Sequence, residues 1–191
     1  MKTKSKVILF TILIISMSAY IVRVAFVNIN FNTLSSEEIT YKLDDEVPIE
    51  NNYFNSSVEN ADGDTIKVLS TEFVSMDEFQ AEHKDFASDL FAENVLLVKV
   101  LVRNVDNTNG GINFGYYLIQ EGSYISFLNR DAYPFVNKHD TLMFSIKPNT
   151  EMEFVLPFNI DSNYIDIEKL KSGTPTLVVS LYPHKKVIEL K

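Results

Sequence analysis

The sequence contains no cysteine among its 191 residues. Without cysteine the chain has no disulfide bond, no thiol nucleophile, no thiolate metal site and no lipid-bearing cysteine of a lipoprotein. Histidine is scarce, because only His83, His139 and His184 occur, and their spacing is not that of metal ligands. We therefore expect no metal and no cofactor.

Glycine is also sparse, and its six copies are scattered, so no glycine-rich loop that would cradle a phosphate is present in the sequence. Gly122-Ser123 lacks the flanking residues of a nucleophile elbow, and His139-Asp140 is a pair in sequence alone. We therefore predict no catalytic residues and a function other than catalysis.

Acidic residues are missing from the first 23 positions, which hold Lys2, Lys4, Lys6 and Arg23. Of the 17 Lys and Arg residues, 13 thus fall in residues 24–191 with all 26 Asp and Glu residues, giving 13 − 26 = −13. An acidic body disfavours nucleic acid and anionic lipid as partners, and it suits a cationic partner.

One long apolar run follows the N-terminal lysines, at residues 7–27. As a helix it would span about 30 Å, enough to cross a membrane with Arg23 at the far interface. The lysines predict that the tail (1–6) is cytoplasmic and that the apolar run is a membrane anchor (7–27) with an exported domain (39–191) beyond it. The polar residues between the anchor and the domain predict a spacer (28–38). A cleaved signal peptide is the alternative, because small residues lie at Ser16, Ser18 and Ala19. Either interpretation places the body outside the cytoplasm.

The exported part has the pattern of short strands, and the clearest covers residues 94–104. Leu96, Val98, Val100 and Val102 alternate along it, which predicts a central strand with one core-facing side. Other strands are expected at 65–74, 113–120, 124–128, 141–146, 151–158 and 176–182, with edge pieces at 39–43, 47–49 and 186–190.

Turns and short helices separate these strands. Ser75-Met-Asp-Glu78 is a capping box, which predicts a helix from about residue 76 to 84. Residues 60–64 favour a β-turn over a calcium loop, because the glycine is misplaced and no closing glutamate follows. A loop is expected at 129–140 and a short helical crossing at 161–170. These elements together predict an all-β, immunoglobulin-like antiparallel two-sheet sandwich with one short inserted helix, preceded by a transmembrane helix.

Four segments, at 47–54, 63–70, 95–104 and 177–183, carry a resemblance to a known family. Across residues 39–190 the chain resembles a family of uncharacterised Gram-positive bacterial proteins with a membrane segment and an extracytoplasmic immunoglobulin-like domain. That family is itself a domain of unknown function, so the resemblance implies a fold and no catalytic residues.

Aromatic side chains are the remaining candidates for function. On one interpretation Phe114, Tyr116 and Phe127 are core and the others cover sheet edges. On the other, Tyr117, Tyr124, Tyr133 and Phe135 form an exposed patch for a protein or glycan partner.

Two functions follow from these patterns. The first is a membrane-anchored binding or scaffolding module for a surface partner. The second is an accessory or self-immunity protein that captures a cationic peptide toxin by charge. A secreted form after signal cleavage remains an alternative to both.

Overall fold

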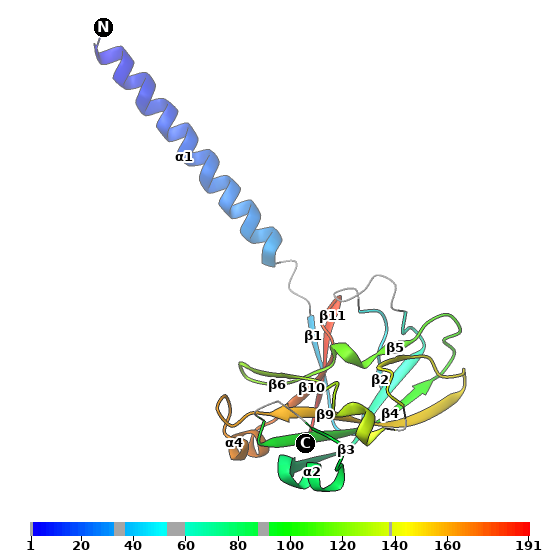
Figure 1. Ribbon diagram of the computed structural model, residues 1–191. Coiled ribbons are helices and arrows are strands. Elements are labelled where there is room, and N and C mark those ends of the chain that lie inside the picture. Colours follow the sequence, from blue (N-terminus) through cyan, green and yellow to red (C-terminus); the bar gives the residue numbers. More distant parts are fainter. Residues whose placement is uncertain (1, 33–36, 53–59, 88–91, 138) are drawn as a thin grey trace. The chain divides into compact units, whose positions relative to one another are not determined.

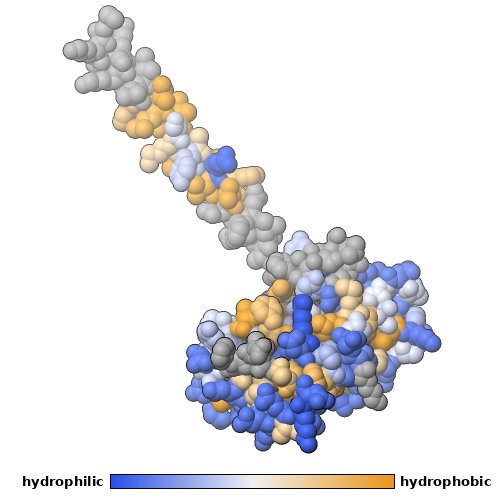
Figure 2. Space-filling view, viewed as in Figure 1, coloured by the Kyte–Doolittle hydropathy of each residue, from blue (hydrophilic) through white to orange (hydrophobic). Residues whose placement is uncertain are grey.

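A computed structural model describes residues 2–32, 37–52, 60–87, 92–137 and 139–191. It divides into two units, residues 1–36 and 37–191. The first contains α1 (Lys2–Asn32), in which the stretch Phe10–Val27 has a mean hydropathy of 2.1. This helix is long and apolar enough to span a membrane or to serve as a signal sequence, and Figure 2 shows its apolar side chains on the surface. Because α1 ends at Asn32 and β1 begins at Glu37, both overlap the predicted spacer.

The described residues of the second unit are mostly β-structure, in three sheets (Figure 1). The larger two have five and four strands, and all neighbours are antiparallel except β1 and β11, which are parallel. In spatial order, the five-stranded sheet contains β1 (Glu37–Tyr41), β11 (His184–Glu189), β10 (Thr176–Ser180), β6 (Leu118–Glu121) and β7 (Tyr124–Phe127). The four-stranded sheet contains β2 (Val47–Pro48), β3 (Asp64–Ser75), β4 (Asn94–Asn104) and β9 (Thr150–Ile160), and the small sheet contains β5 (Ile112–Asn113) and β8 (Met143–Phe144).

Short helices connect the strands: α2 (Met76–Glu82), the 3₁₀ turn η1 (Phe114–Tyr116), α3 (Tyr133–Val136) and α4 (Ile167–Ser172). The capping box predicted for α2 is confirmed. The Ser75 hydroxyl accepts from the Glu78 backbone N–H at 3.2 Å, and the Glu78 carboxylate accepts from the Ser75 N–H at 3.1 Å. These bonds satisfy donors that the first helical turn leaves free, so the helix begins where the sequence predicts.

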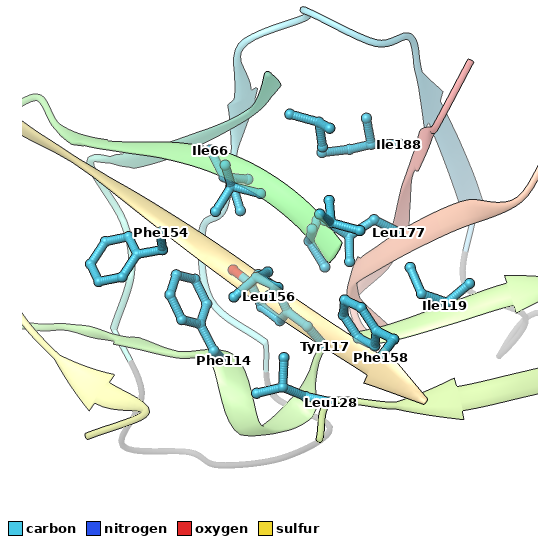
Figure 3. Packing of buried hydrophobic residues seen from close by; sticks show 14 of the residues in the cluster. Ile66, Phe114, Tyr117, Ile119, Leu128, Phe154, Leu156, Phe158, Leu177 and Ile188 are labelled. Carbon is cyan, nitrogen blue, oxygen red and sulfur yellow. The ribbon is translucent and has the colours of Figure 1, made fainter. Parts of the chain in front are cut away.

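Strand β4 is a central strand, as predicted, and its neighbours are β3 and β9. Leu96, Val98, Val100 and Val102 have no exposed surface, and they join one apolar core to which both larger sheets contribute. Figure 3 shows Ile66, Leu156 and Phe158 of one sheet packed opposite Ile119, Leu177 and Ile188 of the other. This shared core fixes the two sheets face to face.

Several predicted elements differ in the structure. The strand expected at 113–120 is interrupted by η1, because the Asn113 side chain accepts from the Gly115 N–H at 2.9 Å and turns the backbone. The strand expected at 141–146 is reduced to β8, and the loop at 129–140 contains α3. Strand β11, which was expected as an edge strand at 186–190, is internal, because β1 pairs with its outer side. Polar side chains that bond the backbone locally explain the first of these differences.

A buried polar network joins three segments at one end of the four-stranded sheet: the turn before β3, the turn after β4 and the segment before β9. The Asn107 amide donates to the Asp64 carboxylate at 2.8 Å and to the Asn60 carbonyl at 2.9 Å. The Asn104 amide donates to the Asn107 and Ile146 carbonyls, both at 2.8 Å. The predicted turn at 60–64 is confirmed, since the Asp64 N–H donates to Ala61 O at 3.0 Å.

Burial raises the pKa of Asp64 above its ordinary value of 3.8, with the nearby Asp106 adding to the effect and the Asn107 amide opposing it. Protonation of Asp64 therefore favours the folded state. Its contribution to the free energy of unfolding is complete below the pKa that Asp64 has in the unfolded chain, and it is lost as pH rises through the higher pKa that Asp64 has in the folded protein.

We expect Asp64→Asn to gain stability relative to the unmodified chain as pH rises from about 3 to 7, because an amide does not ionise while its oxygen still accepts from Asn107. Urea unfolding across this pH range measures the difference. The exposed Asp62→Asn serves as a control for a nearby charge. A stability difference for Asp64→Asn that stays constant or falls with pH would contradict this account.

Candidate functional site

The outer edge of the five-stranded sheet presents apolar side chains to solvent. In β7, Ile125 is 49% exposed and Phe127 is 66% exposed, whereas Ser126 between them is buried. The Ser126 hydroxyl donates to the Asn159 carbonyl at 2.6 Å, and the Tyr124 hydroxyl reaches the same oxygen at 3.3 Å. Since successive residues of a strand point to opposite faces, these inward bonds turn Ile125 and Phe127 outward.

The corresponding edge of the four-stranded sheet is sealed. The Asn137 side chain donates to Val155 O at 2.7 Å and accepts from Val155 N at 2.9 Å, so it occupies the edge of β9 as a further strand would. Asn129 N donates to Pro157 O at 2.8 Å, which covers the same edge further along. Directly after β7, Leu128 forms an antiparallel bridge with Phe158 of β9. Along Tyr124–Phe127 itself, by contrast, the only strand that pairs with β7 within the described part of the chain is β6.

An open groove of about 650 Å³ lies along β7, and we call it the β7 groove. Its lining residues are Ser123, Tyr124, Ile125, Ser126, Phe127, Asn159, Asp161 and Tyr164. The lining combines the apolar side chains of Ile125 and Phe127 and two tyrosine rings with the polar side chains of two serines, Asn159 and Asp161, so it offers both apolar contacts and hydrogen-bonding groups to a partner. Asp161 is the one charged residue in this lining.

The Asp161 carboxylate has one oxygen that accepts hydrogen bonds from Asn163. Oδ1 accepts from the backbone N–H and the side-chain amide of Asn163, both at 2.8 Å, and none of the described residues donates to Oδ2. The pKa of Tyr124 is raised, chiefly by burial and further by the Asp161 charge, against the hydrogen bonds that lower it. The phenol therefore stays neutral near pH 7, and the groove carries a single negative charge.

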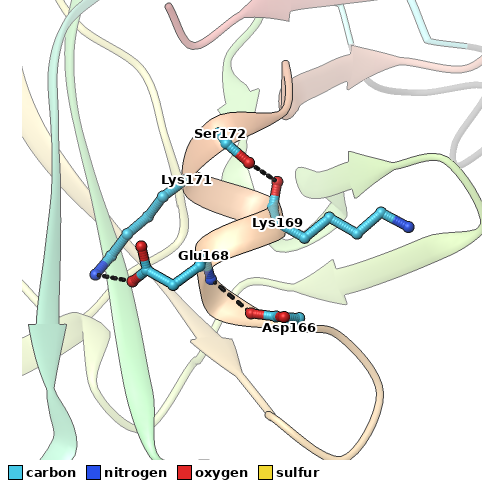
Figure 4. Close-up of polar contacts among 5 residues, drawn as sticks. All are labelled: Asp166, Glu168, Lys169, Lys171 and Ser172. Atoms are coloured by element: carbon cyan, nitrogen blue, oxygen red, sulfur yellow. Dashed lines mark hydrogen bonds and ion pairs between the residues drawn. The ribbon is translucent and has the colours of Figure 1, made fainter.

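The loop that carries Asp161 and Tyr164 is held to the domain by buried side chains that follow it in the sequence. Tyr164 is 79% exposed, but the adjacent Ile165 is buried, as is Leu170 of α4. Figure 4 shows Asp166 capping α4 through the Glu168 N–H at 2.8 Å. An exposed aromatic ring on an anchored loop supplies contact area at a low cost in conformational entropy.

Comparison with protein families gives one result: the model of the domain of unknown function DUF5028 matches residues 38–186. The chain belongs to this family. No curated protein and no solved structure matches the chain. The match covers every β-strand except part of β1 and the end of β11, so the DUF5028 domain contains the whole β7 groove.

The DUF5028 domain does not assemble the exposed aromatic patch predicted from the sequence. Tyr117 and Tyr133 are buried, at 3% and 0% exposure, because both pack against Phe114 in the core (Figure 3 shows Tyr117 there). Phe135 is 37% exposed and packs instead on Phe86, with ring centroids 5.3 Å apart. Of the four predicted residues, Tyr124 alone lines the β7 groove.

Burial also raises the pKa of Tyr133, to about 12. Its hydroxyl has no hydrogen-bond partner within the described residues. We expect Tyr133→Phe to raise the free energy of unfolding by about 1 kcal/mol, because burying an unpaired hydroxyl is unfavourable. Thermal unfolding followed by circular dichroism measures this change. A loss of stability instead would indicate that the hydroxyl is hydrogen-bonded in the folded protein.

Three residues of the β7 groove were not found from the sequence. Phe127 was expected in the core on one interpretation, and it is exposed. In Tyr124-Ile-Ser-Phe-Leu128 apolar residues occupy both alternating sets, so periodicity does not identify the inward face. Ile125 was missed for the same reason. Tyr164 lies outside any strand, and no sequence pattern marks it.

A second hollow, of about 350 Å³, lies on the DUF5028 domain beside β4 and β9. Its charged residues are already paired, since Lys99 Nζ lies 2.6 Å from Glu153. His139 stacks edge-on against Phe154 with ring centroids 5.3 Å apart. Among the described residues, His, Asp and Glu side chains form no group of three that would hold a metal. This hollow therefore offers less to a ligand than the β7 groove does.

Proposed function

We propose that the chain is a non-enzymatic, membrane-anchored module whose domain lies outside the cytoplasm and binds a surface partner at the β7 groove. The observation that carries the proposal is the contrast between two sheet edges. The edge of β9 is covered by Asn137, whereas β7 leaves Ile125 and Phe127 exposed beside a groove. Exposed apolar sheet edges favour association with another chain. An exposed apolar edge on the surface of a folded protein is therefore typical of an interaction site.

The anchored, exported topology is supported by α1 and by the charge that surrounds it. The apolar stretch follows three lysines, which favour the cytoplasmic side. Signal cleavage would give a secreted module with the same groove. We propose further that the two sheets form an immunoglobulin-like sandwich of the kind found on Gram-positive surfaces, which is supported by the common core between them.

Site-specific photo-cross-linking on intact cells tests the proposal. Benzoylphenylalanine at position 127 is expected to give a discrete adduct, because this side chain lines the β7 groove. Met143, 61% exposed and outside the β7 groove, is the control position. Equal adducts at both positions, or none at either, would reject the β7 groove as the binding surface.

A second function is supported by charge. Residues 24–191 carry 13 basic and 26 acidic residues, and Asp161 lines the groove. We propose as the alternative that the chain protects its host membrane by capturing a cationic peptide toxin. Cells that express it would then tolerate more of such a peptide, and Asp161→Asn would reduce this tolerance. Protection that is unchanged by Asp161→Asn and by added salt would reject this function.

A further inference from the structure

We infer that the β7 groove takes an extended, basic peptide segment, which adds to β7 as a further antiparallel strand. This inference rests on the proposed binding function and specifies the chemistry of the partner. It combines three independent features of the groove: the direction of the backbone groups of β7, the apolar side chains beside them, and Oδ2 of Asp161, to which none of the described residues donates.

The backbone of β7 offers hydrogen-bonding groups to a new strand. β6 and β7 are joined by the turn Gly122-Ser123, with Gly122 at φ +56°, and Glu121 pairs with Tyr124. In a two-residue hairpin the closing pair is hydrogen-bonded, and bonded and non-bonded pairs then alternate. Ile125, opposite Gln120, is thus in a non-bonded pair. Its N–H and C=O point away from β6, toward the open edge.

The side chains of β7 lack the features that protect the other sheet edges from pairing with another chain. β2 contains Pro48, which does not donate to a neighbouring strand, and β1 begins with Glu37 and Glu38. β7 contains neither proline nor charge, and Ile125 and Phe127 point outward. A partner strand would lay apolar side chains over Phe127 and Tyr164 while its backbone pairs with Ile125.

Charge selects among the occupants of this edge. A basic side chain of the added segment would reach Asp161 Oδ2, whereas an acidic one would be repelled by it and by the net −13 of residues 24–191. The same acidity disfavours a second copy of this chain at β7.

The test uses the full chain in neutral detergent micelles and a short fluorescent peptide of alternating valine and lysine. Two derivatives carry N-methyl groups on alternate amides, one set on each edge of the extended peptide. Strand addition uses one edge only, so one derivative is expected to lose affinity about tenfold or more and the other to bind as before. Replacing lysine by glutamate in the peptide is expected to abolish binding.

Two protein variants provide an independent readout. Ile125→Pro removes the outward N–H, and Phe127→Lys adds a positive charge at the edge, so both are expected to weaken peptide binding. Met143→Lys is the matched control, and thermal unfolding checks that each variant is folded. If Ile125→Pro does not fold, the two methylated peptides still decide the question.

Other outcomes would overturn the inference and leave the proposed function intact. Equal loss of affinity for both methylated peptides, or no loss for either, would reject strand addition. Absence of peptide binding, together with a cross-link from position 127 on cells, would reject a basic peptide and retain a partner at the β7 groove. Concentration-dependent dimerisation that Phe127→Lys abolishes would identify a second copy of the chain as the occupant.

Discussion

Replacing Lys186 with alanine is expected to lower the free energy of unfolding by about 3 kcal/mol, because a buried charge and its hydrogen bonds are lost together. Lys186 is 3% exposed on β11, and its Nζ donates to the Pro48 carbonyl at 2.7 Å and pairs with the Glu50 carboxylate. One side chain of the five-stranded sheet thus binds the end of β2 in the four-stranded sheet. Its removal leaves Pro48 O without its donor and opens a cavity between the sheets.

The adjacent lysine provides a matched control. Lys185 pairs with Glu38 at 2.7 Å, but both side chains are partly exposed, and such surface pairs contribute less than about 1 kcal/mol. For a chain of this size, 3 kcal/mol corresponds to a fall in melting temperature on the order of 10 °C. Similar losses for Lys185→Ala and Lys186→Ala in thermal unfolding would contradict a linking role for Lys186.

Replacing Phe114 with alanine is expected to have an effect of the same order or larger, about 3 to 5 kcal/mol. Phe114 has no exposed surface, and its ring lies about 5 Å from the rings of Phe144 and Phe154, edge-on to both. It also packs on Tyr117 and Tyr133. Truncation would leave a cavity at the centre of this aromatic group that no neighbour can fill without moving.

Phe127→Ala is the control for this second prediction, since it removes the same ring from an exposed position. We expect it to change the free energy of unfolding by less than about 0.5 kcal/mol. Urea unfolding of the two variants measures the contrast. A large loss for Phe127→Ala would show that its ring is covered in the folded protein and would remove it from the β7 groove.

The parts of the fold that could be predicted are those in which local and tertiary preferences agree. Along β4, the alternation of Leu96, Val98, Val100 and Val102 matches a pleated strand with a buried face, and the structure places all four at zero exposure. The capping box at Ser75 determines the start of α2 by hydrogen bonds within four residues. Such signals need no knowledge of distant neighbours.

The parts that could not be predicted depend on partners far along the chain. The Asn137 side chain bonds Val155, 18 residues away, and Lys186 reaches back to Glu50 across 136 positions. No local pattern indicates either pair. The pairing of β1 with the outer side of β11 has the same origin, because parallel strands distant in sequence leave no turn signal between them.

The candidate site was mostly missed for a related physical reason. Tyr133 and Phe135 occur next to a proline in a region expected to be a loop, yet Pro134 lies in the first turn of α3, and this helix directs Tyr133 into the core. Phe127 and Ile125 face outward because Ser126 bonds Asn159, 33 residues further on. Aromatic content alone therefore did not separate core residues from surface residues.

The central claim, that the β7 groove faces the outside of the cell on an anchored chain, can be tested with one introduced cysteine. The natural chain has none, so Phe127→Cys provides a single thiol for a membrane-impermeant maleimide. We expect labelling of intact cells, with the labelled chain retained in the membrane fraction. Ile119→Cys, at a fully buried position, should stay unlabelled. Labelling of position 127 only after the cells are permeabilised would contradict the account.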